Sequence, residues 1–173
     1  IAGVYRSDTG ETQKMIEDLG RTFLPIKADL SSTEPVNRII EETLVKFGKI
    51  DILVNNAGII RRNETIDFSE KDWDDVMNVN SKTLFFLSQA VAKQFIKQGT
   101  GGKIINIASM LSYQGGIRVP SYTASKHAVM GLTRIMANEW AKYNINVNAI
   151  APGYMVTNNT AALRADEKRY NEI

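Results

Sequence analysis

The chain has 173 residues, of which 43% are hydrophobic, and its 21 basic and 19 acidic residues leave a formal net charge of +2. This length and apolar content predict a single domain, residues 1–173, with a substantial core. The small charge surplus gives no broad field of one sign, so we expect neither nucleic acid nor a membrane as a partner. With no cysteine and one histidine, we expect a cytoplasmic protein without disulfides or a metal site.

Strand-like and helix-like segments alternate along the whole chain. The apolar runs that predict strands are residues 1–5, 22–28, 50–54, 103–108 and 145–150. The segments with helical periodicity are residues 11–20, 31–48, 69–99 and 120–142. Such alternation predicts an α/β fold, in which a parallel sheet carries helices on both faces.

Local signals refine three of these elements. Pro25 lacks a ladder donor and predicts an edge position for the strand at 22–28. Residues 31–33 predict the N-cap of the following helix. The short apolar run at 50–54 predicts a strand buried on both faces, ending in the turn at 55–58.

Acidic residues gather at the start of the helix expected at 69–99. They are Glu70, Asp72, Asp74 and Asp75. A metal site is one interpretation, but their spacing matches no calcium loop, and acids in a first helical turn are favoured by the helix dipole. We therefore expect a solvated helix start.

Ligands of parallel sheets bind where the strands end. Asp29, residues 55–58, Ser109 and residues 152–157 all follow predicted strands. We expect these segments, although distant in sequence, to share one crevice.

Tyr122 and Lys126 lie four residues apart just after Pro120, so they share one face of the predicted helix. A cation roughly 5 Å from a phenol, at an effective dielectric of about 20, is worth about 3 kcal/mol and lowers the tyrosine pKa by about two. That would suit a general acid and base. An exposed lysine beside a packed tyrosine is the alternative that the pair alone leaves open.

Five motifs extend the pattern across the chain. They are N-N-A-G at 55–58, V-N at 79–80, N-I-A-S at 106–109, Y-T-A-S-K at 122–126 and A-P-G-Y-M-V-T at 151–157. In order and spacing they resemble the short-chain dehydrogenase/reductase family. The resemblance implies a Rossmann-like, doubly wound parallel sheet and an NAD(P)-dependent oxidoreductase.

The resemblance also assigns a catalytic tetrad. Tyr122 would be the acid and base, and Ser109 would hydrogen-bond the reacting oxygen. Lys126 would lower the tyrosine pKa and hold the nicotinamide ribose, and Asn80 would keep a water in the proton relay.

Cofactor contacts follow from the same resemblance. Tyr122 and Lys126 would take part in them. The other residues implied are Asp29 near the adenine, Asn56, Ala57 and Gly58 at the adenosine ribose, and Pro152, Gly153 and Thr157 at the carboxamide. Gly58 and Asn55 have an alternative role, the stabilisation of the central sheet.

The family also has an opening strand and a T-G-x-x-x-G-x-G loop that the printed sequence does not contain. The resemblance places that strand between those beginning at Ile1 and Ile50, so we expect a gap there, and we expect the intact protein to extend beyond both ends of this chain. Where the family reads the adenosine 2′ position, this chain has Tyr5 and Arg6. That leaves NAD(H) and NADP(H) both open as cofactor.

Residues 55–62, 69–80, 105–122 and 148–160 resemble most the branch of the family that acts on sugar acids of the 2-deoxy-gluconate or 3-deoxy-hexulosonate type. The candidate substrate-binding residues are Arg61, Arg62, Gln114 and Arg118. One of the three arginines would bind the carboxylate, because guanidinium offers a bidentate fork; a surface or subunit contact is the alternative for each.

Three other functions fit the same motifs. They are a 3-oxoacyl carrier-protein reductase, a glucose dehydrogenase and a dinucleotide-binding regulator without activity. The resemblance further implies a homotetramer in which the helices around 73–97 and 120–142 form the interface.

Overall fold

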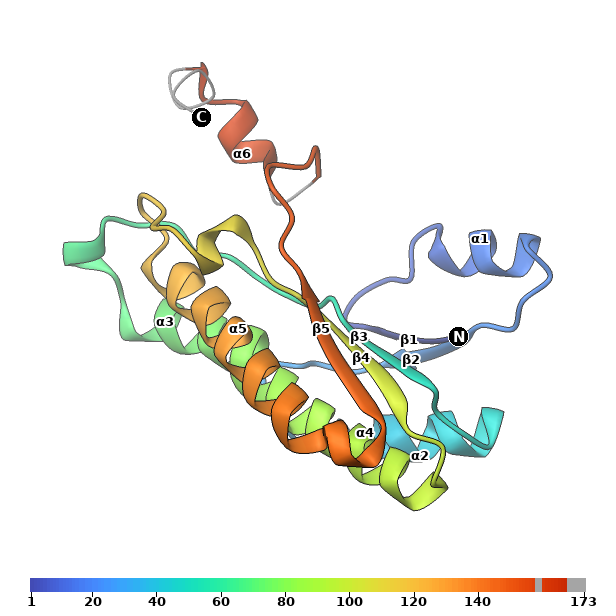
Figure 1. Ribbon diagram of the computed structural model, residues 1–173. Helices are drawn as coiled ribbons and strands as arrows, with labels where there is room; N and C mark the ends of the chain where they lie inside the picture. Colours follow the sequence, from blue (N-terminus) through green and yellow to red (C-terminus); the bar gives the residue numbers. More distant parts are fainter. Residues whose placement is uncertain (158–159, 168–173) are drawn as a thin grey trace.

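The computed structural model describes residues 1–157 and 160–167 (Figure 1). The strands are β1 Ala2–Tyr5, β2 Leu24–Lys27, β3 Ile52–Asn55, β4 Gly102–Ile107 and β5 Ile145–Ile150. The helices are α1 Thr12–Asp18, α2 Val36–Phe47, α3 Glu70–Met77, α4 Leu84–Gln98, α5 Pro120–Trp140 and α6 Ala161–Arg164. A π-helix, Asn78–Thr83, joins α3 to α4. Within the described residues no helix is long and apolar enough to cross a membrane.

The strands form two parallel sheets. β1 pairs with β2, and β3, β4 and β5 pair in that order. Among the described residues no ladder joins β1 to β3, which confirms the gap expected between them. Because all pairings are parallel, every strand ends on the same side of its sheet, and the predicted α/β architecture is confirmed.

The gap has a consequence for β3. Ile52 and Val54 are 59% and 53% exposed, so the prediction of a strand buried on both faces is wrong. The strand is paired with β4 along one edge only, and its apolar residues therefore face solvent in the described part of the chain. The edge position predicted from Pro25 for β2 is confirmed.

The helix predicted over 69–99 is divided into α3, the π-helix and α4. Ser69 caps its start by accepting a hydrogen bond from the Asp72 amide at 3.1 Å, as expected of a solvated helix start. The predicted cap at residues 31–33 is wrong, because α2 begins at Val36 with Pro35 at its N-cap position and without a side-chain cap.

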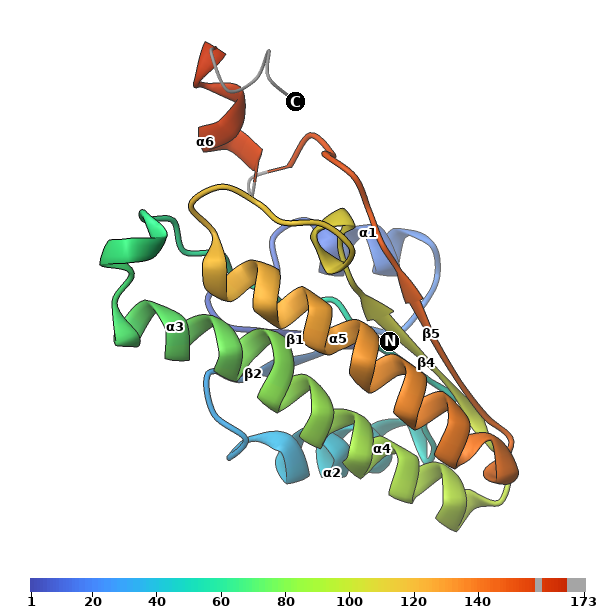
Figure 2. The same cartoon turned by 60° about the vertical axis from the view of Figure 1, so that its left-hand side comes forward.

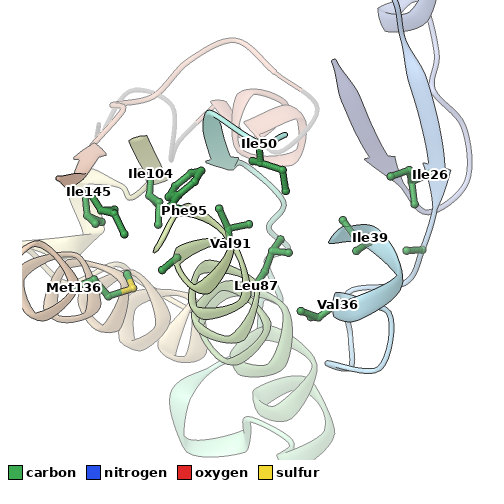
Figure 3. Packing of buried hydrophobic residues seen from close by; sticks show 13 residues of the cluster. Ile26, Val36, Ile39, Ile50, Leu87, Val91, Phe95, Ile104, Met136 and Ile145 are labelled. Atoms are coloured by element: carbon green, nitrogen blue, oxygen red, sulfur yellow. The ribbon is translucent and has the colours of Figure 1, made fainter. Parts of the chain in front are cut away.

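One apolar core joins the two sheets. Figure 3 shows Ile26 of β2 and Ile39 of α2 on one side and Leu87, Phe95 and Ile104 of α4 and β4 on the other. All five side chains are buried. Helix α2 therefore holds the β1–β2 pair against the larger sheet without a strand ladder between them.

Helices α4 and α5 run side by side along the three-stranded sheet (Figure 2). Beneath them the Asn55 amide donates to Asn106 Oδ1 at 2.8 Å and to Ser88 Oγ at 2.9 Å, and Asn106 donates to Thr133 Oγ1 at 2.9 Å. All four polar side chains are buried. This network ties β3 and β4 to both helices just below the strand ends.

Candidate active site

Residues from five segments, one of them Thr160 and Leu163 at helix α6, line a small pocket of about 100 Å³ at the strand ends. Ser109 follows β4, Tyr122 lies on the first turn of α5, and Pro152 and Gly153 follow β5. Arg62 from the loop after β3 completes the polar part of the wall. Of the strand-end segments predicted to share one crevice, the pocket thus brings together Ser109 and the start of residues 152–157, while neither Asp29 nor residues 55–58 line it.

Lys126 is buried, with 5% of its surface exposed, although it carries an amine. Its Nζ donates to the carbonyl of Ile107 at 2.5 Å and lies 5.5 Å from the centre of the Tyr122 ring. Burial lowers the pKa of Lys126 to about 8 because the low dielectric disfavours the charged form. The lysine can therefore exchange a proton near neutral pH.

The pKa of Tyr122 departs from our expectation. It is raised, chiefly by burial, while a hydrogen bond with Ser109 and the positive charge of Arg62 partly oppose that effect. The prediction that a lysine charge would dominate and lower this pKa is wrong for the protein by itself, because it left out the desolvation of the phenol. Ser109 and Arg62 are the neighbours that stabilise the phenolate.

Asn80 lies inside the π-helix and is 1% exposed. Its Oδ1 accepts from the Ile59 amide at 2.9 Å, and its Nδ2 donates to the Ile59 carbonyl at 3.0 Å and to Ser125 Oγ at 3.1 Å. The Ser125 hydroxyl in turn donates to the Tyr122 carbonyl at 2.8 Å. Asn80 thus links the loop after β3 to the tyrosine turn of α5.

Gly58 lies at the centre of these contacts. A Cβ at this position would lie 3.4 Å from Asn80 Oδ1 and 3.9 Å from Lys126 Nζ. The N-N-A-G turn therefore packs directly against two members of the tetrad. A methyl group at this position would make ordinary van der Waals contact with both side chains.

The adenosine end of the predicted cofactor site lies at the ends of β1 and β2. Asp29 accepts a hydrogen bond from the Ser31 amide at 2.8 Å, and its pKa is lowered by its hydrogen bonds with Ser31 and by the positive charge of Arg6. Arg6 and Asp29 follow the ends of two paired strands, in which Tyr5 is opposite Lys27, so both lie at the same edge of the two-stranded sheet. Asn56 and Ala57 are exposed beyond β3.

The segment after β5 packs against the loop after β4. Met110 donates its backbone N–H to the Pro152 carbonyl at 3.2 Å, and a Cβ on Gly153 would lie 3.2 Å from Met110 Sδ. Thr157 is exposed, and its carbonyl accepts from Arg164 of α6 at 3.2 Å.

The three arginines predicted to bind the substrate differ in the groups that surround them. Arg61 pairs with Asp72 at 3.4 Å and with Asp75 at 3.2 Å, so it neutralises the acidic start of α3. Arg118 pairs with Glu64 at 3.0 Å. Arg62 alone of the three lines the pocket with Ser109 and Tyr122.

Gln114 is exposed, and its backbone N–H donates to the Met110 carbonyl at 3.3 Å.

Residues that we did not predict also meet at this site. Met110, Tyr154 and Leu111 line the pocket, and Ser112 and Ser125 hydrogen-bond the elements that carry the tetrad. Of these five residues, Tyr154 and Ser125 lay inside motifs used for prediction, A-P-G-Y-M-V-T and Y-T-A-S-K.

A phenol and a hydroxyl in one pocket, with a buried amine 5.5 Å from the centre of the phenol ring, can move a proton to or from a substrate oxygen. Comparison with known proteins agrees with this chemistry. The family model described as short chain dehydrogenase matches residues 2–168. The chain belongs to this family and is an NAD(P)-dependent oxidoreductase.

Individual relatives are similar over the whole chain. A 2-dehydro-3-deoxy-D-gluconate 5-dehydrogenase of Dickeya dadantii is 65% identical over 100% of this chain and 68% of its own length. The enzyme of the same name from Escherichia coli is 64% identical with the same coverage. A solved structure from Agrobacterium tumefaciens, described as a candidate 2-deoxy-D-gluconate 3-dehydrogenase with bound NADP, is 51% identical, has a TM-score of 0.86, and is matched over 99% of this chain and 68% of that one.

Proposed function

We propose that this protein interconverts a secondary alcohol and a ketone on a sugar acid of the 2-deoxy-gluconate or 3-deoxy-hexulosonate type. The observation that carries the proposal is the position of Arg62, which places a cation in the same small pocket as Ser109 and Tyr122. A sugar acid brings a carboxylate and an oxidisable hydroxyl into one molecule, and this pocket offers a partner for each. The names of the similar dehydrogenases support the same substrate class.

In this proposal Tyr122 exchanges the proton on the substrate oxygen, and Ser109 hydrogen-bonds that oxygen. Lys126, held at Ile107, offers a charge or a proton next to the phenol. Asn80 fixes the loop after β3 against α5 through Ile59 and Ser125, where a proton relay to solvent would pass. When bound, the nicotinamide supplies or accepts the hydride at the substrate carbon.

The residues present fit the two ends of NAD(H) or NADP(H). Gly58 leaves room at the turn between the adenosine side and Lys126, and the strand-end segments Asn56–Ala57 and Pro152–Thr157 would contact the ribose and the carboxamide. Arg6 beside Asp29 can pair with a 2′-phosphate. Arg6→Ala should then raise KM for NADPH while leaving KM for NADH unchanged; an equal effect on both would favour NAD(H).

The test of the substrate class compares a sugar acid with its neutral sugar. Arg62→Ala should lower kcat/KM for 2-dehydro-3-deoxy-gluconate on the order of a hundredfold, as expected for the loss of a charge-assisted hydrogen bond of about 3 kcal/mol. The neutral analogue should lose much less, because for it the substitution removes only the effect of Arg62 on the Tyr122 phenolate. Arg118→Ala, which removes the arginine that pairs with Glu64, is the matched control, and equal losses of both substrates in Arg62→Ala would refute the proposal.

Other functions remain as outcomes of the same assay. Turnover of a 3-oxoacyl thioester or of glucose in place of the sugar acid would identify another reductase of the family. Binding of NADPH without turnover of any of these would identify a regulator.

The proposal includes a cytoplasmic homotetramer that needs neither nucleic acid nor a membrane. Trp73, Phe86, Ile96 and Ile135 are 40% to 47% exposed on α3, α4 and α5. A subunit interface along these helices would bury them. Ile135→Asp should lower the mass measured by light scattering, and a monomeric wild-type protein would contradict the assembly.

A further inference from the structure

Ser112 lies between two members of the tetrad without touching the pocket. It ends the short 3₁₀ helix Met110–Ser112 and is 5% exposed. Its hydroxyl accepts a hydrogen bond from the Ser109 amide at 3.2 Å and donates to the Lys126 carbonyl at 2.8 Å. One buried hydroxyl therefore joins the backbone of Ser109 to the backbone of Lys126.

A second connection joins the same two elements. Lys126 Nζ donates to the carbonyl of Ile107, two residues before Ser109. The lysine is thus fixed to the end of β4 at both its backbone and its amine. Ser109, Ser112, Lys126 and Ile107 form a closed ring of hydrogen bonds and covalent chain.

The loop that connects these elements is poorly suited to hold them in place. Residues 113–119 contain Gly115 and Gly116, and Arg118 has a φ of 65°, a conformation that costs a non-glycine residue roughly 1–2 kcal/mol. Tyr113, Gln114 and Ile117 in the same loop are exposed. The distance from Ser109 to the tyrosine turn must be fixed by contacts across the loop, and Ser112 makes such a contact.

We propose that Ser112 is a positioning residue, whose hydroxyl sets the placement of Ser109 relative to Tyr122 and Lys126. It touches neither substrate nor cofactor and acts through its two hydrogen bonds. The inference rests on the proposed function, because its main readout is turnover of the sugar acid. It assigns to Ser112 a role that follows from its geometry alone.

Ser112→Ala removes the hydroxyl and leaves a small buried side chain. We expect kcat to fall on the order of tenfold, since a slightly misplaced reacting group costs rate more than binding, with KM changed by less than about threefold. The apparent pKa that governs kcat for alcohol oxidation should move to higher pH, because the hydrogen bond of Ser109 to Tyr122 is weakened. Ser112→Thr, which keeps the hydroxyl, should restore most of kcat.

Thr43→Val is the matched control. Thr43 donates its hydroxyl to the Ile39 carbonyl at 2.7 Å on α2, away from the pocket, so its loss affects stability but neither kcat nor the pH profile. A Ser112→Ala enzyme with the kcat and pH profile of the wild type would overturn the inference. A wild type that turns over no sugar acid would instead refute the proposed function.

Amide hydrogen exchange gives a second measurement that needs no activity. The Ser109 amide should exchange slowly in the wild type, because Ser112 accepts its hydrogen bond. Rapid exchange there would overturn the inference even if Ser112→Ala fails to fold.

Discussion

Burial of the charged amine of Lys126 lowers the stability of the folded protein by an amount that depends on pH. Its ammonium is buried and has one described hydrogen bond, to the Ile107 carbonyl. The pKa falls from the ordinary value of 10.5 to about 8. At 1.36 kcal/mol per pH unit, this difference of about 2.5 units corresponds to roughly 3 kcal/mol of destabilisation when the amine is charged.

The direction of this pH dependence follows from the number of protons that Lys126 binds in the folded and in the unfolded chain. Below pH 8 the lysine is protonated in both the folded and the unfolded chain, so the full cost is present. Between about pH 8 and 10.5 the unfolded chain holds a proton that the folded chain has lost, so the free energy of unfolding rises with pH. Above pH 10.5 the cost has disappeared.

Lys126→Met tests this reasoning, since methionine is similar in length and carries no charge. Urea unfolding of both proteins at several pH values gives the difference in free energy of unfolding, wild type minus variant. Titrations that both proteins share cancel in that difference. It should rise by about 3 kcal/mol between pH 8 and 10.5 and be flat below pH 7. A difference that stays constant across this range would refute the assigned burial cost.

Three further substitutions test the fold and the site. Gly101→Ala should lower the free energy of unfolding, measured by urea titration, by more than about 2 kcal/mol. Gly101 has a φ of +68°, and a Cβ would lie 2.2 Å from the Asn144 carbonyl oxygen. As a control, Gly10→Ala should lower it by less, because Gly10 has a φ of +55° but open space around its Cβ position. Asn106→Ala should cost roughly 2–4 kcal/mol by the same assay, since it leaves the Asn55 amide short of a buried partner; a cost below 1 kcal/mol would contradict the network. Gly58→Val should lower kcat severalfold, because its methyl groups extend beyond a Cβ that would already touch Asn80 Oδ1 at 3.4 Å, and an unchanged kcat would contradict the close packing.

Much of the fold could be predicted because its signals are local. Gly48 and Gly99 follow α2 and α4 in the left-handed conformation, which only their lack of a side chain makes easy, and both helix ends were predicted there. The parallel arrangement followed from the alternation of strands and helices. The four candidate catalytic residues could be proposed from the sequence because their motifs are short and contiguous.

What could not be predicted depends on neighbours distant in sequence. The buried residues of the π-helix Asn78–Thr83 are polar, namely Asn80, Ser81 and Thr83, so the periodicity of apolar residues does not show it. The raised pKa of Tyr122 reflects burial, which the Tyr122–Lys126 spacing does not report. The separation of Arg62 from Arg61 required knowing that Asp72 and Asp75 lie beside the latter.

Replacement of the phenol is the most direct test of the proposed chemistry. Tyr122→Phe removes the hydroxyl and keeps the ring, and Tyr113→Phe does the same to an exposed tyrosine of the neighbouring loop. With 2-dehydro-3-deoxy-gluconate and NAD⁺ or NADP⁺, whichever the wild type uses, kcat of Tyr122→Phe should fall by about 10² to 10⁴, the contribution of a general base, while Tyr113→Phe should retain wild-type kcat. A Tyr122→Phe enzyme with undiminished kcat would contradict the account.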